Sequence, residues 1–361
     1  MNILIVKLSA IGDVVHTLPS LAALRKLYPQ ASITWVIEEA AADLINGHPD
    51  LDHVLVSHRK RWMRELKKGH LKTIKEIHQF IKELRSCHYD LVIDFHGLLK
   101  SSLIVFLASA VRKIGYDSMQ ELSGLFVKEK VFQDMDKHAV DRYLDLVRYL
   151  GYRDVATPSG NSCDAVVAAE NCQKKAEFVI PISDAQEKKV MHLLDCQGLT
   201  EKFVAVNPTA LWETKLWKDQ GFANLCDRIV KDLRLPIVFT GSHKEEINRI
   251  QSLMSAPSVN LAGATSLREL ACLYRRATLV ITTDTGPMHI AAAMETPVLA
   301  LFGPTDALRT GPYGLRHRVV SMDIPCRPCF RKKCSTLDCM QRITVVEVYQ
   351  AVRDLLCDIS A

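Results

Sequence analysis

Short apolar runs alternate with amphipathic segments along the first half of the chain. The apolar runs lie at 2–6, 33–37, 53–56 and 91–95. Segments such as 71–85 and 138–150 instead repeat their apolar residues at helical spacing. Runs of this length are typical of strands buried on both faces, and such strands form parallel sheets that crossover helices cover. The pattern therefore predicts an α/β class with a doubly wound parallel sheet.

The same alternation begins again in the second half. Its apolar runs lie at 203–207, 236–241, 259–263, 279–284 and 297–303. Between the halves, residues 155–175 carry Pro, Gly, Ser and Asn with weak periodicity, which favours a domain junction. We therefore predict two doubly wound, Rossmann-like domains facing a cleft, 1–165 and 166–361. The final amphipathic segment predicts a helix, and we allow for this helix to pack back on the first domain.

The composition narrows the class of protein. Hydrophobic residues make up 48% of the chain and charged residues 24%, with a formal charge of +5, as in a soluble globular protein. Lys7 interrupts the opening apolar run, so we do not expect a signal peptide, and no stretch reaches the roughly 18–20 apolar residues of a membrane span. Eleven cysteines without an export signal then predict reduced thiols in the cytoplasm.

The first strand-to-helix turn holds Gly12 and Asp13, at a place where α/β proteins bind ligands. A dinucleotide-binding turn would be glycine-rich and would receive phosphate at the helix N-terminus, where a carboxylate repels it. The missing GxGxxG counts against a nicotinamide dehydrogenase. From the residues alone, Asp13 is either a catalytic group or a helix cap.

The second half carries the pattern of an anion site in LVITTDTGPMHIAAAMETPVLALFGPTD, residues 279–306. A buried strand ends at Asp284, Thr285 can cap the next helix, and Gly286 allows a ligand to approach the backbone. Exposed amides and the helix dipole suit a diphosphate. His289 follows on the face of Thr285. Two ordinary capped helices that bind no ligand would show the same sequence pattern, so this alternative stays open.

Two other loops end at the same edge of the predicted sheet. NPTALWETKLW, residues 207–217, follows a strand and contains Thr209 and Lys215. A lone lysine is usually a surface charge, but this one lies at the end of the sheet where the diphosphate is expected. FTGSHKEE places Glu245 where its carboxylate could accept hydrogen bonds from ribose hydroxyls. An ordinary glutamate in the first turn of a helix explains Glu245 equally well.

Two segments stand out by composition. HRKRWMRELKKGHLKTIK, residues 58–75, has eight Lys or Arg and one Glu, and such a run is usually a solvated face. The loop CRPCFRKKCSTLDCM gathers four cysteines, Cys326, Cys329, Cys334 and Cys339. Four thiolates can bind zinc, but C-x2-C-x4-C-x4-C is not a standard zinc-ribbon spacing. Zinc, a disulfide and free thiols therefore all stay open.

Taken together, these motifs resemble glycosyltransferase family 9. The resemblance rests, in order from residue 1 to about 306, on KLSAIGDVVHTLP, HRKRW, VIDFHGLLKS, HAVDR, TKLW and DTGPMHIAAAMETPVLALFGPTD. It implies a GT-B fold with the acceptor on the N-terminal domain and the nucleotide sugar on the C-terminal domain. It also implies an inverting transfer of L-glycero-D-manno-heptose from ADP-heptose to Kdo of the lipopolysaccharide inner core.

The resemblance further implies roles for single residues. Asp13 would be the general base, and Lys215 would offset the charge of departing ADP, with no metal or cofactor. The donor would contact Thr209, Lys215, Glu245, Asp284, Thr285, Gly286 and His289. The acidic acceptor, with its Kdo carboxylates and lipid A phosphates, would contact Lys60, Arg61, Trp62, Arg64, His138 and Arg142. Met63 departs from the basic residue expected after the tryptophan.

We expect a monomer that is peripheral to the cytoplasmic face of the inner membrane. Its partners would be ADP-heptose and Kdo–lipid A, and no nucleic acid. One alternative is heptosyltransferase II or another sugar transferase of the same family. A second alternative, of another class, is a non-catalytic protein whose basic segment 58–75 binds a membrane surface or a nucleic acid.

Overall fold

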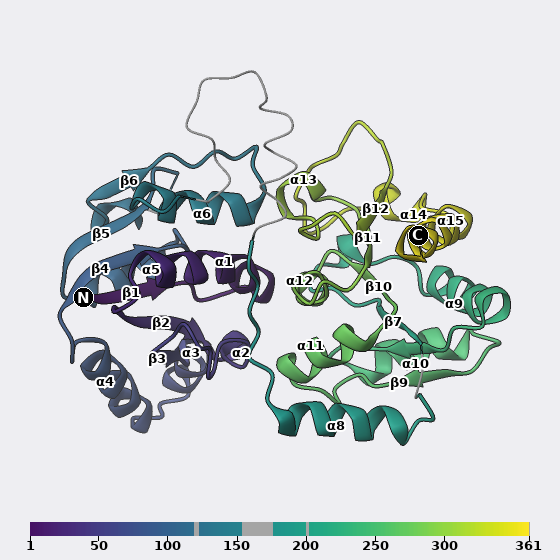
Figure 1. Ribbon diagram of the computed structural model, residues 1–361, viewed down its shortest axis with the longest axis horizontal. Coiled ribbons are helices and arrows are strands. Elements are labelled where there is room, and N and C mark those ends of the chain that lie inside the picture. Colours follow the sequence, from purple (N-terminus) through teal and green to yellow (C-terminus); the bar gives the residue numbers. More distant parts are fainter. Residues whose placement is uncertain (119–122, 154–175, 200–201, 361) are drawn as a thin grey trace. The chain divides into compact units, whose positions relative to one another are not determined.

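The computed structural model describes residues 1–118, 123–153, 176–199 and 202–360 (Figure 1). The chain divides into two compact units, Met1–Pro181 and Ile182–Ala361. The junction expected at 155–175 lies outside the described residues. The domain boundaries expected from the sequence, 1–165 and 166–361, therefore stay a prediction.

The described part of the first unit is built on a six-stranded parallel sheet with the strand order β3-β2-β1-β4-β5-β6. Its strands are β1 (Asn2–Val6), β2 (Ser32–Glu38), β3 (His53–Ser57), β4 (Tyr89–Asp94), β5 (Ala110–Tyr116) and β6 (Glu129–Val131). The two central strands pair in the register Val6 to Asp94. Side chains of β1 and β4 are buried on both faces, as their continuous apolar runs predict.

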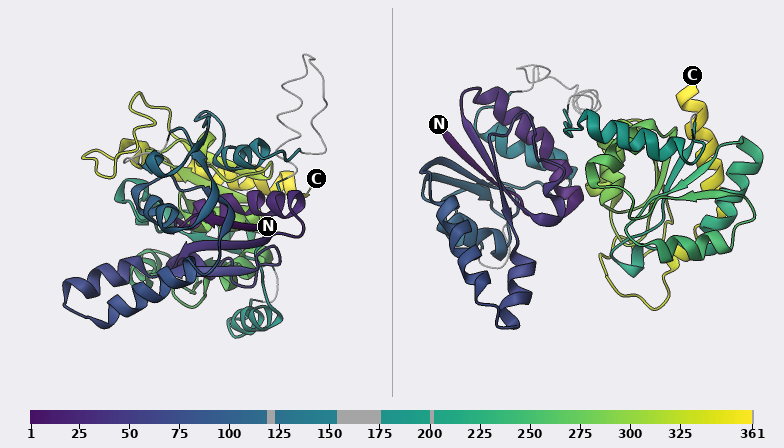
Figure 2. Two further views of the ribbon diagram at one scale, coloured as in Figure 1. Left: turned by 90° about the vertical axis from the view of Figure 1, so that its left-hand side faces the viewer. Right: turned by 90° about the horizontal axis from the view of Figure 1, so that it is seen from below.

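Helices cover both faces of this sheet (Figures 1 and 2). They are α1 (Ile11–Leu27), α2 (Glu39–Ala42), α3 (Arg59–Lys67), α4 (Lys72–Leu84), α5 (Leu99–Leu107) and α6 (Ala139–Tyr149), with a 3-10 turn at Ser123–Phe126. Helices α1 and α6 pack against each other. On the other face, one apolar cluster joins Leu4 and Val6 of β1 to Trp62 of α3, Phe80 of α4 and Val105 of α5.

The second unit repeats this plan with the strand order β12-β11-β10-β7-β8-β9. Its strands are β7 (Val204–Asn207), β8 (Ile237–Phe239), β9 (Ser258–Asn260), β10 (Leu279–Thr283), β11 (Val298–Phe302) and β12 (His317–Ser321). Its helices are α8 (Asp184–Asp195), α9 (Asp219–Leu233), α10 (Lys244–Ser252), α11 (Leu267–Arg276), α12 (Gly286–Ala293), α13 (Ala307–Thr310), α14 (Asp338–Gln341) and α15 (Val345–Ser360), with a 3-10 turn at Glu213–Lys215. All strand pairs are parallel.

The last helix, α15, belongs to the core of the second unit. Its buried residues Val348, Tyr349, Val352 and Leu355 lie in one apolar cluster with β7, β10 and β11. The expected return of this helix to the first domain stays a prediction.

The predicted α/β class and its two doubly wound sheets are confirmed. Every apolar run singled out in the sequence forms a strand, within one to three residues at each end. The sequence pattern missed β5, β6 and β12. These strands lie toward the sheet edges, where polar residues such as Arg112 and Arg318 interrupt the apolar run because one side of the strand meets solvent.

Candidate active site

A cluster of polar side chains gathers at the centre of the first sheet, where β1 and β4 end side by side. The chain proceeds from β1 to β2 and β3 on one side and then to β4, β5 and β6 on the other. At such a switch point the loops after the two central strands diverge and leave room for a ligand. Lys7 and Asp13 follow β1, and Phe95 and His96 follow β4.

Asp13 lies in the first turn of α1, and each of its carboxylate oxygens accepts a hydrogen bond. Oδ2 accepts from the backbone amide of Ala10 at 3.0 Å, and Oδ1 accepts from the hydroxyl of Tyr143 at 3.0 Å. The ammonium of Lys7 lies 3.9 Å from Oδ1 and donates to the Tyr143 oxygen at 2.7 Å. The side chain of Asp13 is still 41% exposed. Helix capping therefore occupies one oxygen and leaves the carboxylate accessible.

The surroundings of Asp13 favour its ionised form. Burial raises the pKa of Asp13, but the Lys7 ammonium, the Ala10 amide and the Tyr143 hydroxyl outweigh it and hold the pKa below its ordinary value. Burial, with the negative charge of Asp13, raises the pKa of Tyr143 well above its usual range. Burial also lowers the pKa of Lys7, although Asp13 and Asp94 oppose this effect. Asp13 is thus a carboxylate at neutral pH, able to accept a proton.

A cavity of about 210 Å³ opens beside Asp13. Its walls include Lys7, Asp13, Tyr116, Tyr143 and residues 95–98. This volume is below that of a pocket for a drug-sized molecule and suits a single sugar residue. The cavity gives Asp13 a place where it can meet a hydroxyl group.

His96 lines the β4 side of this cavity and Asp94 lies buried behind it, and the sequence analysis gave neither residue a role. Asp94 is fully buried, and its carboxylate accepts from the amides of His96 and Gly97 and from the hydroxyl of Ser101. Burial raises the pKa of Asp94 to about 6 against these hydrogen bonds. Burial and the nearby Lys7 lower the pKa of His96 to about 3, so its imidazole is neutral. The motif DFHG, at the end of the apolar run 91–95, was the feature of the sequence that could have pointed to these two residues.

Lys60 and Arg64 are the exposed members of the predicted acceptor set on α3. Lys60 lies 3.4 Å from the carboxylate of Glu38, which is itself buried. Both cations line a groove of about 500 Å³ along α3. In the part of the chain that the structure describes, Arg64 forms no ion pair. Its guanidinium is available to an acidic group.

Arg61 and Trp62 are instead engaged within the first unit. Arg61 pairs with Glu76 of α4 at 2.7 Å and lies 3.6 Å from Glu65. Trp62 is 7% exposed, packs against Phe80, and donates from its indole nitrogen to Glu76 at 3.0 Å. These contacts hold α3 to α4. A contact of either residue with an acceptor stays a prediction. It would require the Arg61–Glu76 ion pair, or the contacts of Trp62 with Phe80 and Glu76, to break first.

His138 and Arg142 also have partners within the first unit. His138 occupies the N-cap of α6, where Nδ1 accepts from the amide of Val140. Arg142 is 8% exposed and donates to the sulfur of Met135 at 3.3 Å. The positive charge of Arg142 lowers the pKa of Lys7, which is the cation beside Asp13. Arg142 therefore affects the electrostatics around Asp13. Their expected place on an acceptor surface stays a prediction.

A second polar cluster lies where β7, β10 and β11 end in the other unit. Asp284 follows β10, and one of its oxygens accepts from Thr305 and pairs with Lys215, both at 2.6 Å. The ammonium of Lys215 also lies 4.6 Å above the ring of Trp212. β7 and β10 flank the switch point of this sheet. The structure thus brings together Lys215 and Asp284, which are 69 positions apart in the sequence.

Gly303 allows the turn after β11 to approach this cluster. A Cβ atom at this position would lie 2.7 Å from the sulfur of Met340 and 3.0 Å from the carbonyl oxygen of Thr214. Arg327, which the sequence reading missed, donates to the carbonyl of Gly303 and thereby holds the cysteine-rich loop over the turn. No local pattern marks Arg327, because its partner is 24 residues away.

Helix α12 begins beside Asp284. Thr285 occupies its N-cap, but its side chain makes no capping hydrogen bond, so the expected side-chain cap is not formed. A proline lies in the first turn, as expected, and Gly286 is the first helical residue. His289 is 6% exposed. Pro287 has no amide hydrogen and the amide of Met288 donates to the backbone carbonyl of Thr285 at 3.1 Å, so the amide of Gly286 is the one at this end that an outside acceptor can reach.

The remaining donor candidates lie at the ends of β7 and β8. The hydroxyl of Thr209 donates to Asn207 at 3.0 Å, and the backbone carbonyl of Thr209 accepts from Thr283. The loop after β7 is thereby tied to β10. Glu245 is exposed in the first turn of α10. Its contact with a ribose stays a prediction.

The four cysteines of the 326–340 loop are not paired in disulfides. Cys326 and Cys334 are exposed, Cys329 is half-buried and Cys339 is buried. Among the described residues, no three His, Cys, Asp or Glu side chains gather as a metal site.

No helix within the described ranges is both long and apolar enough to cross a membrane.

Comparison with known proteins identifies the family of the chain. Residues 77–340 match glycosyltransferase family 9 (heptosyltransferase). The chain belongs to this family. It is therefore a glycosyltransferase, and the resemblance seen in the sequence motifs is confirmed.

Individual relatives agree with the family. Lipopolysaccharide heptosyltransferase 1 of Pseudomonas aeruginosa is 29% identical and is matched over 93% of this chain and 88% of its own length. Lipopolysaccharide heptosyltransferase 3 of Escherichia coli is 27% identical over 82% of this chain and 80% of its own. The solved structure of E. coli heptosyltransferase WaaC with ADP has a TM-score of 0.74 and 25% identity, covering 98% of this chain and all of that one. The chain is thus a heptosyltransferase of lipopolysaccharide biosynthesis with a GT-B fold.

Proposed function

We propose that this enzyme is heptosyltransferase I: it moves L-glycero-D-manno-heptose from ADP-heptose to Kdo of the lipopolysaccharide inner core with inversion at the anomeric carbon. Relatives named heptosyltransferase 1 and heptosyltransferase 3 are almost equally similar to it. The choice between them rests on HTLP after GDVV and on the KRW motif in the chain.

The observation that carries the proposal is the Asp13 carboxylate. It is ionised, accessible and placed at the mouth of a cavity of sugar size. In an inverting transfer, the acceptor hydroxyl attacks the anomeric carbon from the face opposite ADP. Asp13 takes the proton of this hydroxyl as the new C–O bond forms. Its lowered pKa keeps the carboxylate ionised, and its contacts with Tyr143 and Lys7 fix its orientation.

The donor diphosphate is assigned to the second cluster. A diphosphate needs positive charge, and the N-terminus of α12, with the Gly286 amide and the helix dipole, supplies partial positive charge without a capping side chain from Thr285. Lys215 adds an ammonium, and its pairing with Asp284 holds this group in place before ADP binds. As ADP departs, Lys215 offsets the growing negative charge on the β-phosphate.

The acidic acceptor is assigned to α3 of the first unit. Lys60 and Arg64 present their charges on the outer side of this helix, where carboxylates and phosphates of Kdo–lipid A can reach them. This division places acceptor recognition on the unit that holds the base. The cytoplasmic face of the inner membrane would then be the place of the reaction.

The test uses the purified full-length enzyme in three reactions. Two of the three reactions use ADP-heptose, with Kdo–lipid A and with the same acceptor already carrying one heptose, and the third offers Kdo–lipid A as acceptor with ADP-glucose as donor. Mass spectrometry of the products should show one added heptose on Kdo–lipid A alone. Transfer only to the heptosylated acceptor would overturn heptosyltransferase I in favour of a later step, and transfer of glucose would overturn the donor.

A further inference from the structure

Helices α3 and α4 form a hairpin whose tip is held away from the core. The two helices are clasped by the Arg61 ion pair with Glu76 and by the hydroxyl of Thr73, which donates to Glu65 at 2.8 Å. Residues 66–72, which span the end of α3, the turn and the start of α4, are all exposed. In the left view of Figure 2, these two slate-blue helices project beyond the sheet of their own unit. The two helices of the hairpin are thus held together by side-chain contacts, and their connecting end is exposed to solvent.

The tip of this hairpin exposes large apolar side chains. Leu66 is 42% exposed, Leu71 75% and Ile74 52%, and Met63, one turn before Leu66, is 51% exposed. Single exposed apolar residues are normal on a protein surface, whereas here four lie within twelve positions of one hairpin, beside a run of cations. A purely solvated charged face would carry polar side chains at these positions. The tip therefore presents apolar surface that has no partner in the described part of the chain.

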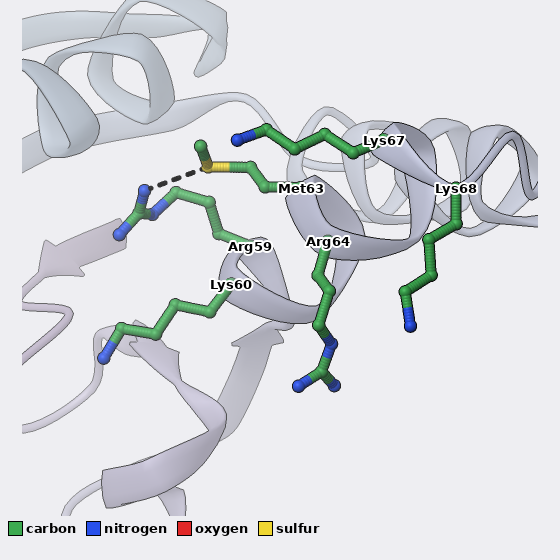
Figure 3. Close-up of a pocket in the computed structure, with 6 residues that line it drawn as sticks. All are labelled: Arg59, Lys60, Met63, Arg64, Lys67 and Lys68. Carbon is green, nitrogen blue, oxygen red and sulfur yellow. Dashed lines mark hydrogen bonds between the residues drawn. The ribbon is translucent and has the colours of Figure 1, made fainter.

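The same end of the hairpin carries strong positive charge. A groove along α3 is lined by Arg59, Lys60, Met63, Arg64, Lys67 and Lys68 (Figure 3). Arg59 and Lys60 are tied to the buried Glu38, whereas Arg64, Lys67 and Lys68 form no ion pair within the described residues. In Figure 3 the side chains of Arg64 and Lys68 extend away from the helix. Cations thus stand beside the apolar tip.

We propose that this hairpin docks on an anionic lipid bilayer, with Leu66, Leu71 and Ile74 entering the headgroup boundary and Lys67 and Lys68 binding lipid phosphates. The proposal rests on the proposed function, because a lipid-anchored acceptor must be met at a membrane. Basic residues beside an exposed apolar face are what binding to an anionic interface requires. A soluble phosphate would use the cations and leave the apolar tip without a purpose.

A nucleic acid fits the hairpin less well. Binding to single strands without sequence preference uses aromatic rings on which bases stack. The one aromatic residue of α3, Trp62, is buried against Phe80. The exposed apolar residues of the tip are all aliphatic, and aliphatic side chains gain little from a phosphate backbone. The bilayer accounts for both the charge and the apolar surface.

The first experiment is flotation of the full-length protein with vesicles. Wild type should float with phosphatidylethanolamine–phosphatidylglycerol vesicles and not with neutral phosphatidylcholine vesicles, and added salt should weaken the binding. The double variant Leu71→Ser/Ile74→Ser should bind anionic vesicles at least about tenfold more weakly. The matched control is Leu253→Ser/Val346→Ser, which removes two apolar side chains of 43% and 66% exposure from the second unit. This control should float like wild type.

A second pair of variants tests the charges. Lys67→Glu/Lys68→Glu should abolish flotation with anionic vesicles, whereas Lys188→Glu/Lys333→Glu, at exposed positions of the second unit, should leave it unchanged. Wild-type binding to neutral vesicles as strong as to anionic ones would overturn the proposal. The proposal would also be overturned if Leu71→Ser/Ile74→Ser floated with anionic vesicles as well as wild type does. Equal losses of flotation in the hairpin variants and in the control variants would overturn it too. Tighter binding of wild type to a single-stranded DNA oligomer than to vesicles would overturn it in favour of a nucleic acid.

A transfer assay separates this proposal from the proposed function. The acceptor is Kdo–lipid A stripped of its acyl chains, which stays in solution. Leu71→Ser/Ile74→Ser should use this soluble acceptor as well as wild type does, but should lose activity on Kdo–lipid A embedded in anionic vesicles. If wild type fails on the soluble acceptor too, the proposed function is at fault. If the variant fails on the soluble acceptor while wild type succeeds, the docking role is wrong.

Discussion

The hydroxyl of Tyr143 donates a hydrogen bond to Asp13 although 130 positions separate the two residues. Tyr143 lies on α6 and Asp13 on α1, and these helices pack against each other beside the first sheet. The same hydroxyl accepts from Lys7, whose ammonium is 3.9 Å from the carboxylate. Tyr143 therefore connects a buried cation to the proposed base, orients that base and, after Lys7 and the Ala10 amide, contributes to its lowered pKa.

Replacement of Tyr143 by Phe should shift the acid limb of the pH profile. The base works only when ionised, so kcat/KM falls as pH falls through the pKa of Asp13, which lies below its ordinary value in wild type. The lost hydrogen bond raises this pKa, and the acid limb should move to higher pH by up to about one unit. The measurement is kcat/KM against pH. Tyr116→Phe, whose hydroxyl donates to the carbonyl of Arg142 instead, is the control and should leave the limb in place.

Asp13→Asn should nearly abolish transfer. The amide keeps the acceptor for the Ala10 backbone but cannot take a proton, and general base catalysis contributes about 10²–10⁴-fold. Calorimetric titration with ADP should give an affinity within a few-fold of wild type, because the nucleotide is assigned to the other unit. Turnover above about a tenth of wild type would remove Asp13 from the role of base.

Lys215→Ala should raise the KM for ADP-heptose and lower kcat, since the ammonium offsets diphosphate charge both before and during departure. It also leaves the buried Asp284 without its cation, so the melting temperature should fall. Lys332→Ala is the control: Lys332 lies over the same Trp212 ring at 5.1 Å but has no contact with Asp284. Donor kinetics that do not change in Lys215→Ala would make Lys215 a structural ion-pair partner only.

Transfer should persist in EDTA. The proposed donor site uses the Gly286 amide at the start of α12 and the ammonium of Lys215 as its positive groups, and the sequence has no Asp-x-Asp motif beside them. The measurement is the initial rate after dialysis against EDTA, with and without added Mg²⁺ or Mn²⁺. A rate that EDTA abolishes and Mg²⁺ restores would contradict this prediction. Circular dichroism on the same samples separates loss of chemistry from loss of fold.

Arg64→Ala and Arg61→Ala should behave differently although they lie in one basic segment. Arg64 is unpaired in the described structure and should bind acceptor, so its loss should raise the KM for Kdo–lipid A by about tenfold, less at high salt, and spare the donor. Arg61 clasps α3 to α4 through Glu76, so its loss should lower the melting temperature of the first unit. Titration of each substrate at low and physiological salt checks both. A donor KM that rises in Arg64→Ala would contradict the assignment of the acceptor to the first unit.

The sequence by itself determined the class of fold and the positions of the two candidate sites. Buried strands such as β1 and β10 need apolar side chains on both faces, so their runs are visible in the order of residues. Because parallel strands bring their carboxyl ends to one edge, Asp13 and Asp284 could be placed at that edge without coordinates. Family motifs added the chemistry.

Only the tertiary structure decided which side chains meet. Tyr143 donates a hydrogen bond to Asp13, and Thr305 donates one to Asp284. Arg61 forms an ion pair with Glu76. Each contact forms because neighbouring elements pack in a particular register. A local pattern records whether a residue faces the core, since side-chain direction repeats every two or 3.6 residues. It does not record which distant residue stands opposite. That depends on the strand order and on the packing of the helices, which the whole chain fixes together.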